Sequence, residues 1–184
     1  MKVLEMNLLL SEKVVVRFGR VVGLLAVILV SGLLGASSAR AEFLTISLDN
    51  DLATEIEDAA ADDKHLVIMF HEEGCPWCNK MRERIFPHPK IVEYYSDRFV
   101  MIEQDIKGDL ELTTPEGELM TQKEFARRMR VRGTPTFVFF DKDGKTAARI
   151  PGYQDVMTFI ASGRYVNEGI FKTGKSMARW QMEQ

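Results

Sequence analysis

The chain has 184 residues, of which 46% are hydrophobic and 28% are charged, with a formal net charge of −3. These values lie in the globular range, so one domain with one well-buried core is expected. No basic run offsets the acidic sign, which argues against a general nucleic-acid role, and no nucleic-acid partner is expected.

Residues 1–41 are predicted to be a signal peptide. A basic stretch precedes an apolar run of about 16 residues, and Ala39 and Ala41 then fit a cleavage site just before Glu42. Removing the five basic and two acidic residues of this segment from 24 and 27 leaves a net charge of about −6. The alternative is an uncleaved membrane anchor, because the run is only slightly shorter than the roughly 17 to 25 residues that span a bilayer.

Residues 42–184 are predicted to form a single domain that begins with a helix. Leu52, Ile56 and Ala59 recur at helical spacing in the stretch 48–64, where aspartates precede them as capping candidates. The continuous apolar run "HLVIMFH" at 65–71 follows, which is typical of a strand buried on both faces. This strand leads directly to the first cysteine.

The remaining elements alternate in type along the chain. They are predicted as a helix at 79–86 ended by two prolines, a short helix at 90–97, a strand at 99–106, an acidic surface loop or small hairpin at 107–120, a helix at 121–131 with a capping box of Thr121 and Glu124, a hairpin over 136–153, a helix at 155–169, and a basic tail at 170–184 that is an extra helix with frayed ends. This order predicts an α/β fold with a central mixed sheet flanked by helices on both faces.

Both cysteines of the chain lie in the stretch "EEGCPWCNKM". A disulfide across about four residues would constrain the unfolded chain by only about 2 kcal/mol, so a structural staple is a poor explanation. A redox dithiol needs one exposed thiolate and a second thiol that resolves the mixed disulfide. Cys75, at the positively polarised start of a helix, suits attack, and Cys78, one turn inside, suits resolution. Pro76 fits the first helical position.

Metal binding is a weaker alternative for this stretch. His71 could join Cys75 and Cys78 in a copper-binding metallochaperone, but such sites normally need three or four ligands and the chain has only two other histidines. Covalent haem attachment requires a histidine where Asn79 stands. No metal and no cofactor are therefore expected. A third class, an interaction domain without redox activity, would function unchanged with both cysteines replaced.

A second motif, "RGTPT", follows about 60 residues later, where Thr134 and Pro135 precede a predicted strand. Proline cannot donate to a sheet ladder, so a proline at the start of a strand often shapes a turn, in some cases with a cis bond. Trp77, between the cysteines, is interpreted as a partly exposed substrate contact, with simple packing as the alternative.

With these residues, "CPWC" and "VRGTPTFVFFDKDGK", the chain from about Leu48 to Gly169 resembles the thioredoxin superfamily. "HEEGCPWCNKM", the acidic insertion and "IPGY" are most similar to exported SoxW-type proteins of sulfur-oxidation clusters. The resemblance implies a thioredoxin-like fold and a redox pair of Cys75 and Cys78. It also implies a cis Pro135 against that pair, and a Thr134 whose backbone binds substrate polypeptide.

Two departures from cytoplasmic thioredoxin follow from the same resemblance. Pro-Trp replaces Gly-Pro between the cysteines, and Met69 stands where thioredoxin has a buried aspartate. Proton transfer to Cys78 must then use another group or water, and Glu72 is the candidate.

The predicted function is an exported, periplasmic thiol-disulfide oxidoreductase that reduces protein disulfides. The resemblance implies electrons from a membrane thiol transporter and a role in sulfur oxidation. A disulfide oxidase or isomerase would use the same residues, because about 30 mV in reduction potential is worth only about 1.4 kcal/mol.

Overall fold

A computed structural model describes residues 43–183. The predicted signal peptide and its cleavage site before Glu42 lie outside these residues. None of the described helices is long and apolar enough to cross a bilayer. The helices are α2 (Leu52–Ala61), α3 (Pro76–Lys80), a π-helical segment η1 (Met81–Ile85), α4 (Pro89–Tyr95), α5 (Gln122–Arg128), α6 (Val156–Asn167), a 3-10 turn η2 (Ile170–Thr173) and α7 (Met177–Gln181), and the strands are β1 (His65–His71), β2 (Phe99–Asp105), β3 (Glu111–Thr113), β4 (Leu119–Thr121), β5 (Thr136–Phe140) and β6 (Thr146–Pro151).

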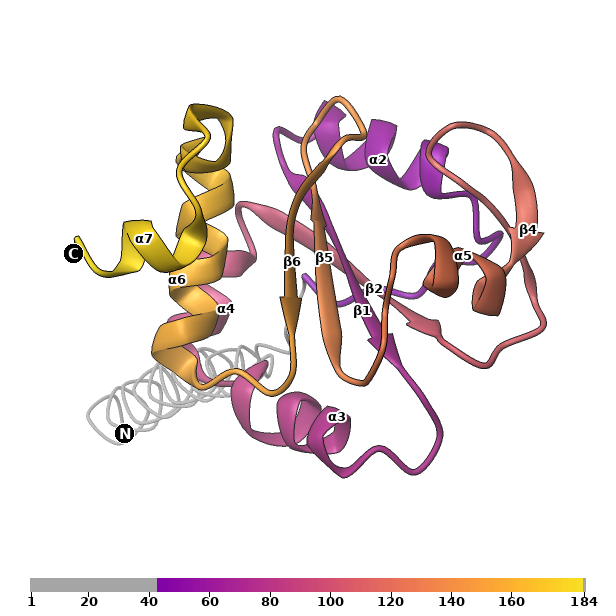
Figure 1. Cartoon of the computed structure of the whole chain (residues 1–184), viewed down its shortest axis with the longest axis horizontal. Coiled ribbons are helices and arrows are strands. Elements are labelled where there is room, and N and C mark those ends of the chain that lie inside the picture. Colours follow the sequence, from indigo (N-terminus) through magenta and orange to yellow (C-terminus); the bar gives the residue numbers. More distant parts are fainter. Residues whose placement is uncertain (1–42, 184) are drawn as a thin grey trace, which may run out of the picture. The chain divides into compact units, whose positions relative to one another are not determined.

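Four strands form one mixed sheet in the order β2-β1-β5-β6 (Figure 1). β1 pairs with β2 in parallel, whereas β1 with β5 and β5 with β6 are antiparallel. The α/β class and the central mixed sheet predicted from the sequence are confirmed. A single parallel bridge from Leu44 to Met101 adds the start of the described chain to the β2 edge.

The sheet buries side chains on both faces because successive residues of a strand point in opposite directions. Along β1, Leu66, Ile68 and Phe70 join the core under α2 and α5, whereas Val67 and Met69 join the core under α3, α4 and α6. Figure 1 shows α2 and α5 on one side of the sheet and α4 and α6 on the other. β1 is therefore apolar throughout, as its sequence predicts for a strand covered on both faces.

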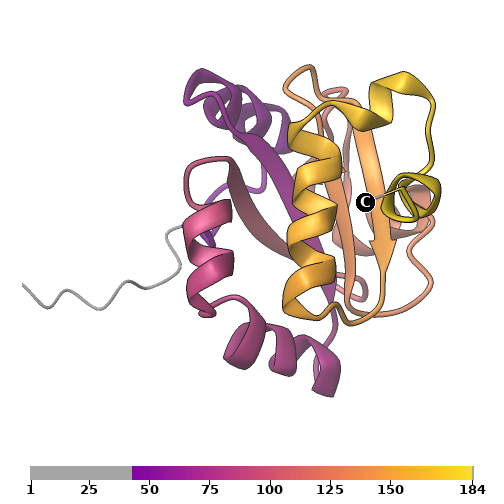
Figure 2. The ribbon, with the colours of Figure 1, turned by 90° about the vertical axis from the view of Figure 1, so that its left-hand side faces the viewer.

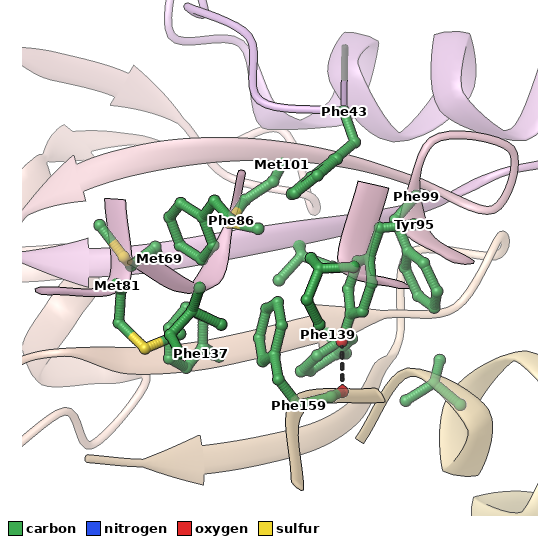
Figure 3. Close-up of a cluster of buried hydrophobic side chains, with 14 of the residues drawn as sticks. Phe43, Met69, Met81, Phe86, Tyr95, Phe99, Met101, Phe137, Phe139 and Phe159 are labelled. Atoms are coloured by element: carbon green, nitrogen blue, oxygen red, sulfur yellow. Dashed lines mark hydrogen bonds between the residues drawn. The ribbon is translucent and has the colours of Figure 1, made fainter. Parts of the chain in front are cut away.

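Aromatic rings fill the core on the α4 and α6 side, where these two helices lie side by side (Figure 2). The Tyr95 ring stacks on Phe159 with centroids 4.5 Å apart, and its hydroxyl donates to the Phe159 carbonyl at 2.7 Å (Figure 3). Burial raises the pKa of Tyr95 well above its usual value, because the phenolate would lose its hydration. The hydroxyl therefore acts as a permanent donor that joins α4 to α6.

The acidic stretch 107–120 contains a small hairpin, one of the two forms predicted for it. β3 and β4 pair there in antiparallel, and Thr113 donates its backbone N–H to the Asn50 carbonyl at 3.0 Å. The helix after it, α5, has the predicted capping box, since Thr121 accepts from the Glu124 N–H and the Glu124 carboxylate accepts from the Thr121 N–H.

The C-terminal tail also contains helix, as η2 and α7. Trp180 is 5% exposed and lies against Tyr165, with ring centroids 6.0 Å apart. The Tyr165 hydroxyl donates to the Lys175 carbonyl at 2.8 Å. The tail therefore packs on α6 and belongs to the same core.

Candidate active site

Strand direction brings four loops together at one end of the sheet, here called the site end. β1 ends at His71, where its antiparallel neighbour β5 begins, because Phe70 pairs with Thr136. β6 ends at the same place, since Pro151 also pairs with Thr136. β2 ends beside β1, because Asp105 pairs with His71. The segments after β1, β2 and β6 and the segment before β5 therefore meet around the start of α3 (Figure 1).

The two cysteines stand at the start of α3 and form a disulfide. Cys75 is the N-cap residue and Pro76 occupies the first turn, as the sequence predicts. The Cys78 backbone N–H donates to the Cys75 sulfur at 3.1 Å. A donor aimed at this sulfur stabilises a thiolate more than a neutral thiol, and so does the positive end of the helix dipole.

Cys75 is more exposed than Cys78, as predicted, but the difference between the two residues is small. Cys78 is fully buried, whereas Cys75 is 7% exposed. The position of Cys75 at the helix start predicts an exposed residue, but its side chain packs into the core while its sulfur accepts the Cys78 N–H. Access to the pair is therefore confined to the Cys75 side, at the surface where the four loops meet.

The Thr134–Pro135 peptide is cis, as the resemblance implied. The Pro135 carbonyl accepts the Gly152 N–H at 2.8 Å, and the Thr136 hydroxyl donates to the Gly133 carbonyl at 2.7 Å. The first bond ties the segment before β5 to the segment after β6, and the second closes a turn within the segment before β5. The backbone around Pro135 is thus held in place by the same hairpin that it begins.

Glu72 connects three of the four loops. Its carboxylate accepts the Thr134 hydroxyl at 3.1 Å and pairs with Lys107 at 2.5 Å, while its carbonyl accepts the Cys75 N–H at 3.3 Å. The hydrogen bonds from Lys107 and then Thr134 hold the pKa of Glu72 below its usual value. An ionised Glu72 with these partners is well suited to position the loops, and it can accept a proton only weakly near neutral pH.

Trp77 lies on the surface beside the pair, half exposed. Its ring is 5.5 Å from that of Tyr153, and the Lys80 ammonium lies 5.0 Å and 4.6 Å from the two ring centroids. A hollow of about 430 Å³ on this side is lined by Trp77, Lys80 and their neighbours in α3 and η1. The exposed aromatic surface suits contact with a polypeptide.

Met69 and His71, which the sequence also singled out, lie on β1. Met69 is fully buried. His71 lies 3.8 Å from Glu103, which also binds the Arg82 guanidinium through two hydrogen bonds of 2.7 and 2.8 Å. Within the described residues, no group of three or more His, Cys, Asp and Glu side chains is arranged to hold a metal ion.

Three features of the site were not predicted from the sequence: Tyr153, which contacts Trp77, Lys107, which pairs with Glu72, and the arginines beside Pro135. Tyr153 lay in the "IPGY" motif, so its place directly after a strand was a usable signal. Lys107 follows β2, whose pairing with β1 cannot be read from either strand alone. These contacts depend on strand register, which a single strand does not specify.

Comparison with known proteins finds a match over residues 52–167 to the family model described as a thioredoxin-like domain. Disulfide bond reductase DsbH of Chlamydia pneumoniae is 27% identical over 99 residues, covering 53% of this chain and 58% of that protein. Thiol:disulfide interchange protein DsbD of Photorhabdus laumondii is 25% identical over 109 residues, covering 57% of this chain and 17% of the relative. The chain thus spans less than two thirds of these relatives.

Among solved structures, a thioredoxin-fold protein from Helicobacter pylori superposes with a TM-score of 0.59 at 21% identity. The match covers 80% of this chain and 89% of that one. At this identity the likeness concerns the fold.

Proposed function

Because this chain belongs to the thioredoxin-like family of disulfide oxidoreductases, we propose that it is an exported protein-disulfide reductase whose redox pair is Cys75 and Cys78. The observation that carries the proposal is the asymmetric pair at the start of α3. Cys75 is the more exposed of the two residues and its sulfur accepts the Cys78 N–H, whereas Cys78 is fully buried.

The reaction starts from the dithiol. The Cys75 thiolate attacks one sulfur of the substrate disulfide, a Cys75–substrate S–S bond forms, the substrate S–S bond breaks, and the released thiolate takes a proton. Cys78 then loses its proton and attacks the Cys75 sulfur. The Cys75–Cys78 disulfide forms, the second substrate sulfur leaves as a thiol, and two electrons have passed to the substrate.

The surrounding residues serve this reaction by positioning the substrate. Thr134 and Pro135 present backbone to the substrate polypeptide, and Trp77 contacts it from the other side. Glu72, held as a carboxylate by Lys107 and Thr134, positions these loops. Proton transfer to or from Cys78 through Glu72 is the weaker role, because its lowered pKa makes the carboxylate a poor base that seldom carries a proton near neutral pH.

A dithiol donor must regenerate the reduced pair. We assign this step to a membrane thiol transporter, as the resemblance to the SoxW type implies, and the thiol:disulfide interchange named for the DsbD relative supports an exchange partner of this kind. The export and periplasmic location rest on the predicted signal peptide at 1–41, and a substrate in sulfur oxidation rests on the resemblance of the Cys-Pro-Trp-Cys region to the SoxW type.

Cysteine trapping tests the proposal. Cys75→Ser should abolish turnover of protein disulfides, whereas Cys78→Ser should attack and remain joined to its substrate, because no resolving thiol is left. Mass spectrometry of adducts released by reductant identifies the trapped proteins. Trapping by Cys75→Ser and none by Cys78→Ser would reverse the roles, and full function of the double serine variant would overturn the proposal.

The equilibrium reduction potential, measured against glutathione, tests separately whether the chain reduces or oxidises its substrates. A value near about −270 mV supports a reductase, and a value near about −120 mV would make the chain an oxidant.

A further inference from the structure

Three arginines surround a hollow beside Pro135 at the site end of the sheet. The hollow has a volume of about 330 Å³ and is lined by Arg130, Arg132 and Arg149 with the backbone near Pro135 and Gly152. All three arginines are exposed, and none of the described residues that line the hollow is acidic. The lining therefore carries three positive charges and no negative one, although the chain as a whole is acidic.

The three guanidinium groups have no partner in the described part of the chain. Within residues 43–183 they make neither an ion pair nor a hydrogen bond, whereas Arg82, Arg128 and Arg164 each bind a carboxylate. An unpaired guanidinium presents its whole fork of donors, which matches a carboxylate in a bidentate geometry. The hollow thus offers three such forks within one concave surface.

The backbone at Arg130 adds an independent reason to look for a partner. Arg130 follows the C-cap residue Met129 and has a φ of 54°, in the left-handed region. Glycine is favoured at this position after a helix, and an arginine there is conformationally strained. The fold alone would be served better by glycine.

The hollow adjoins the reactive pair. Thr134, which lines the hollow, donates to the Glu72 carboxylate, and the Glu72 carbonyl accepts the N–H of Cys75. Residues next to the cysteine of a polypeptide that meets Cys75 are therefore expected to reach this hollow. A carboxylate that pairs with these guanidinium groups is closer to them than the Debye length of about 8 Å at physiological salt, so salt screens this attraction only partly. Repulsion from acidic residues farther away on the surface is screened more strongly.

We infer that the Arg130, Arg132 and Arg149 hollow selects substrate polypeptides that carry acidic residues next to the reactive cysteine. The inference rests on the proposed function, because the occupant is the polypeptide that delivers its sulfur to Cys75. It names the substrate class: proteins whose exchangeable disulfide lies in an acidic segment.

Two matched peptides test it with the full chain in its dithiol form. Each holds one cysteine in a mixed disulfide with the same small aromatic thiol, flanked by Asp and Glu in one peptide and by Lys in the other. We expect kcat/KM to favour the acidic peptide by roughly tenfold at low salt, since exposed ion pairs are weak singly but act together here. The preference should fall below about twofold in 0.5 M salt.

Substitutions of the arginines test whether they cause the preference for the acidic peptide. Arg132→Gln with Arg149→Gln should reduce the ratio between the peptides to about twofold or less. Lys90→Gln with Arg179→Gln removes two exposed positive charges elsewhere and should keep the ratio of the unmodified chain. Arg130→Gly should reduce the ratio while the thermal midpoint stays equal or rises, because glycine relieves the left-handed backbone.

The outcomes separate this inference from the proposed function. Equal turnover of both peptides by the unmodified chain overturns the acidic selectivity and leaves the reductase. The same preference in the Arg132 and Arg149 variant also overturns it. Turnover of neither peptide overturns the reductase and the inference together.

Discussion

The two ends of the sheet differ in how completely their charged side chains are paired within the chain. At the end away from the pair, here called the opposite end, charged side chains find partners within the chain: Lys172 and His65 lie 2.8 and 3.6 Å from the Asp141 carboxylate, and Lys142 binds Asp63. At the site end, three arginines around one hollow have no partner among the described residues.

Burial explains the difference. Asp141 is only 7% exposed, and a carboxylate that loses water must be compensated by donors and positive charge. The site-end arginines remain in water, so they need no internal partner and are open to an external one. Glu72 and Lys107 at the site end are paired, like Asp141 and Lys172 at the opposite end, so the three arginines differ from the charges of both ends in being open to an external partner.

Removing the central carboxylate of the opposite end should have the largest effect. Asp141→Ala leaves His65 and Lys172 without their shared partner and should lower the free energy of unfolding by about 2 kcal/mol. Disulfide exchange at 25 °C should be unchanged. Chemical denaturation measures the free energy of unfolding, and a disulfide-exchange assay measures activity. Asp143→Ala, at an exposed position, is the control. If the folded Asp141→Ala variant lost disulfide exchange, the opposite end would contribute to activity as well as to stability, against this expectation.

At the site end, Trp77→Ala should show the reverse pattern. It removes an exposed ring that contacts Tyr153 and Lys80, so KM for protein disulfides should rise by roughly threefold to tenfold with little change in stability. Met157→Ala, on an exposed methionine of α6, is the control and should change neither. A drop in stability comparable to that of Asp141→Ala would mean that Trp77 is a packing residue.

A smaller effect is expected from loosening the loops. Glu72→Ala and Thr134→Val should each lower kcat/KM for protein disulfides by roughly threefold, and the double variant should be hardly worse than Glu72→Ala, because both changes remove the hydrogen bond between these two side chains. Strictly multiplicative losses would show that the two side chains act separately. Steady-state kinetics on the four proteins of this cycle is the measurement.

The smallest effect concerns pH at the opposite end. Burial, and next the positive charge of Lys142, lower the pKa of His65. The unfolded chain therefore binds a proton more readily, and stability falls as pH drops below the usual histidine value of about 6.5. His65→Asn, which can still donate to the Phe140 carbonyl, should lose less stability between pH 7 and pH 5. An equally steep fall in both proteins would assign the pH dependence to other groups.

Local patterns predicted much of this molecule. The capping box of Thr121 and Glu124 joins neighbours in the sequence, and the apolar run of β1 reports burial on both faces without reference to any other strand. The place of Cys75 and Pro76 at a helix start is equally local. In each case the interacting groups lie within one turn or one strand, so their chemistry is visible in the order of residues.

The sequence by itself therefore determined the elements, their order and the candidate redox pair. Only the tertiary structure decided what surrounds that pair, because Arg130, Arg149 and Lys107 come from segments that meet only through strand register. Register depends on which strands pair and in which direction, and a shift of one residue would turn Arg149 to the other face of β6. The charge of the substrate surface is thus a property of the assembled sheet.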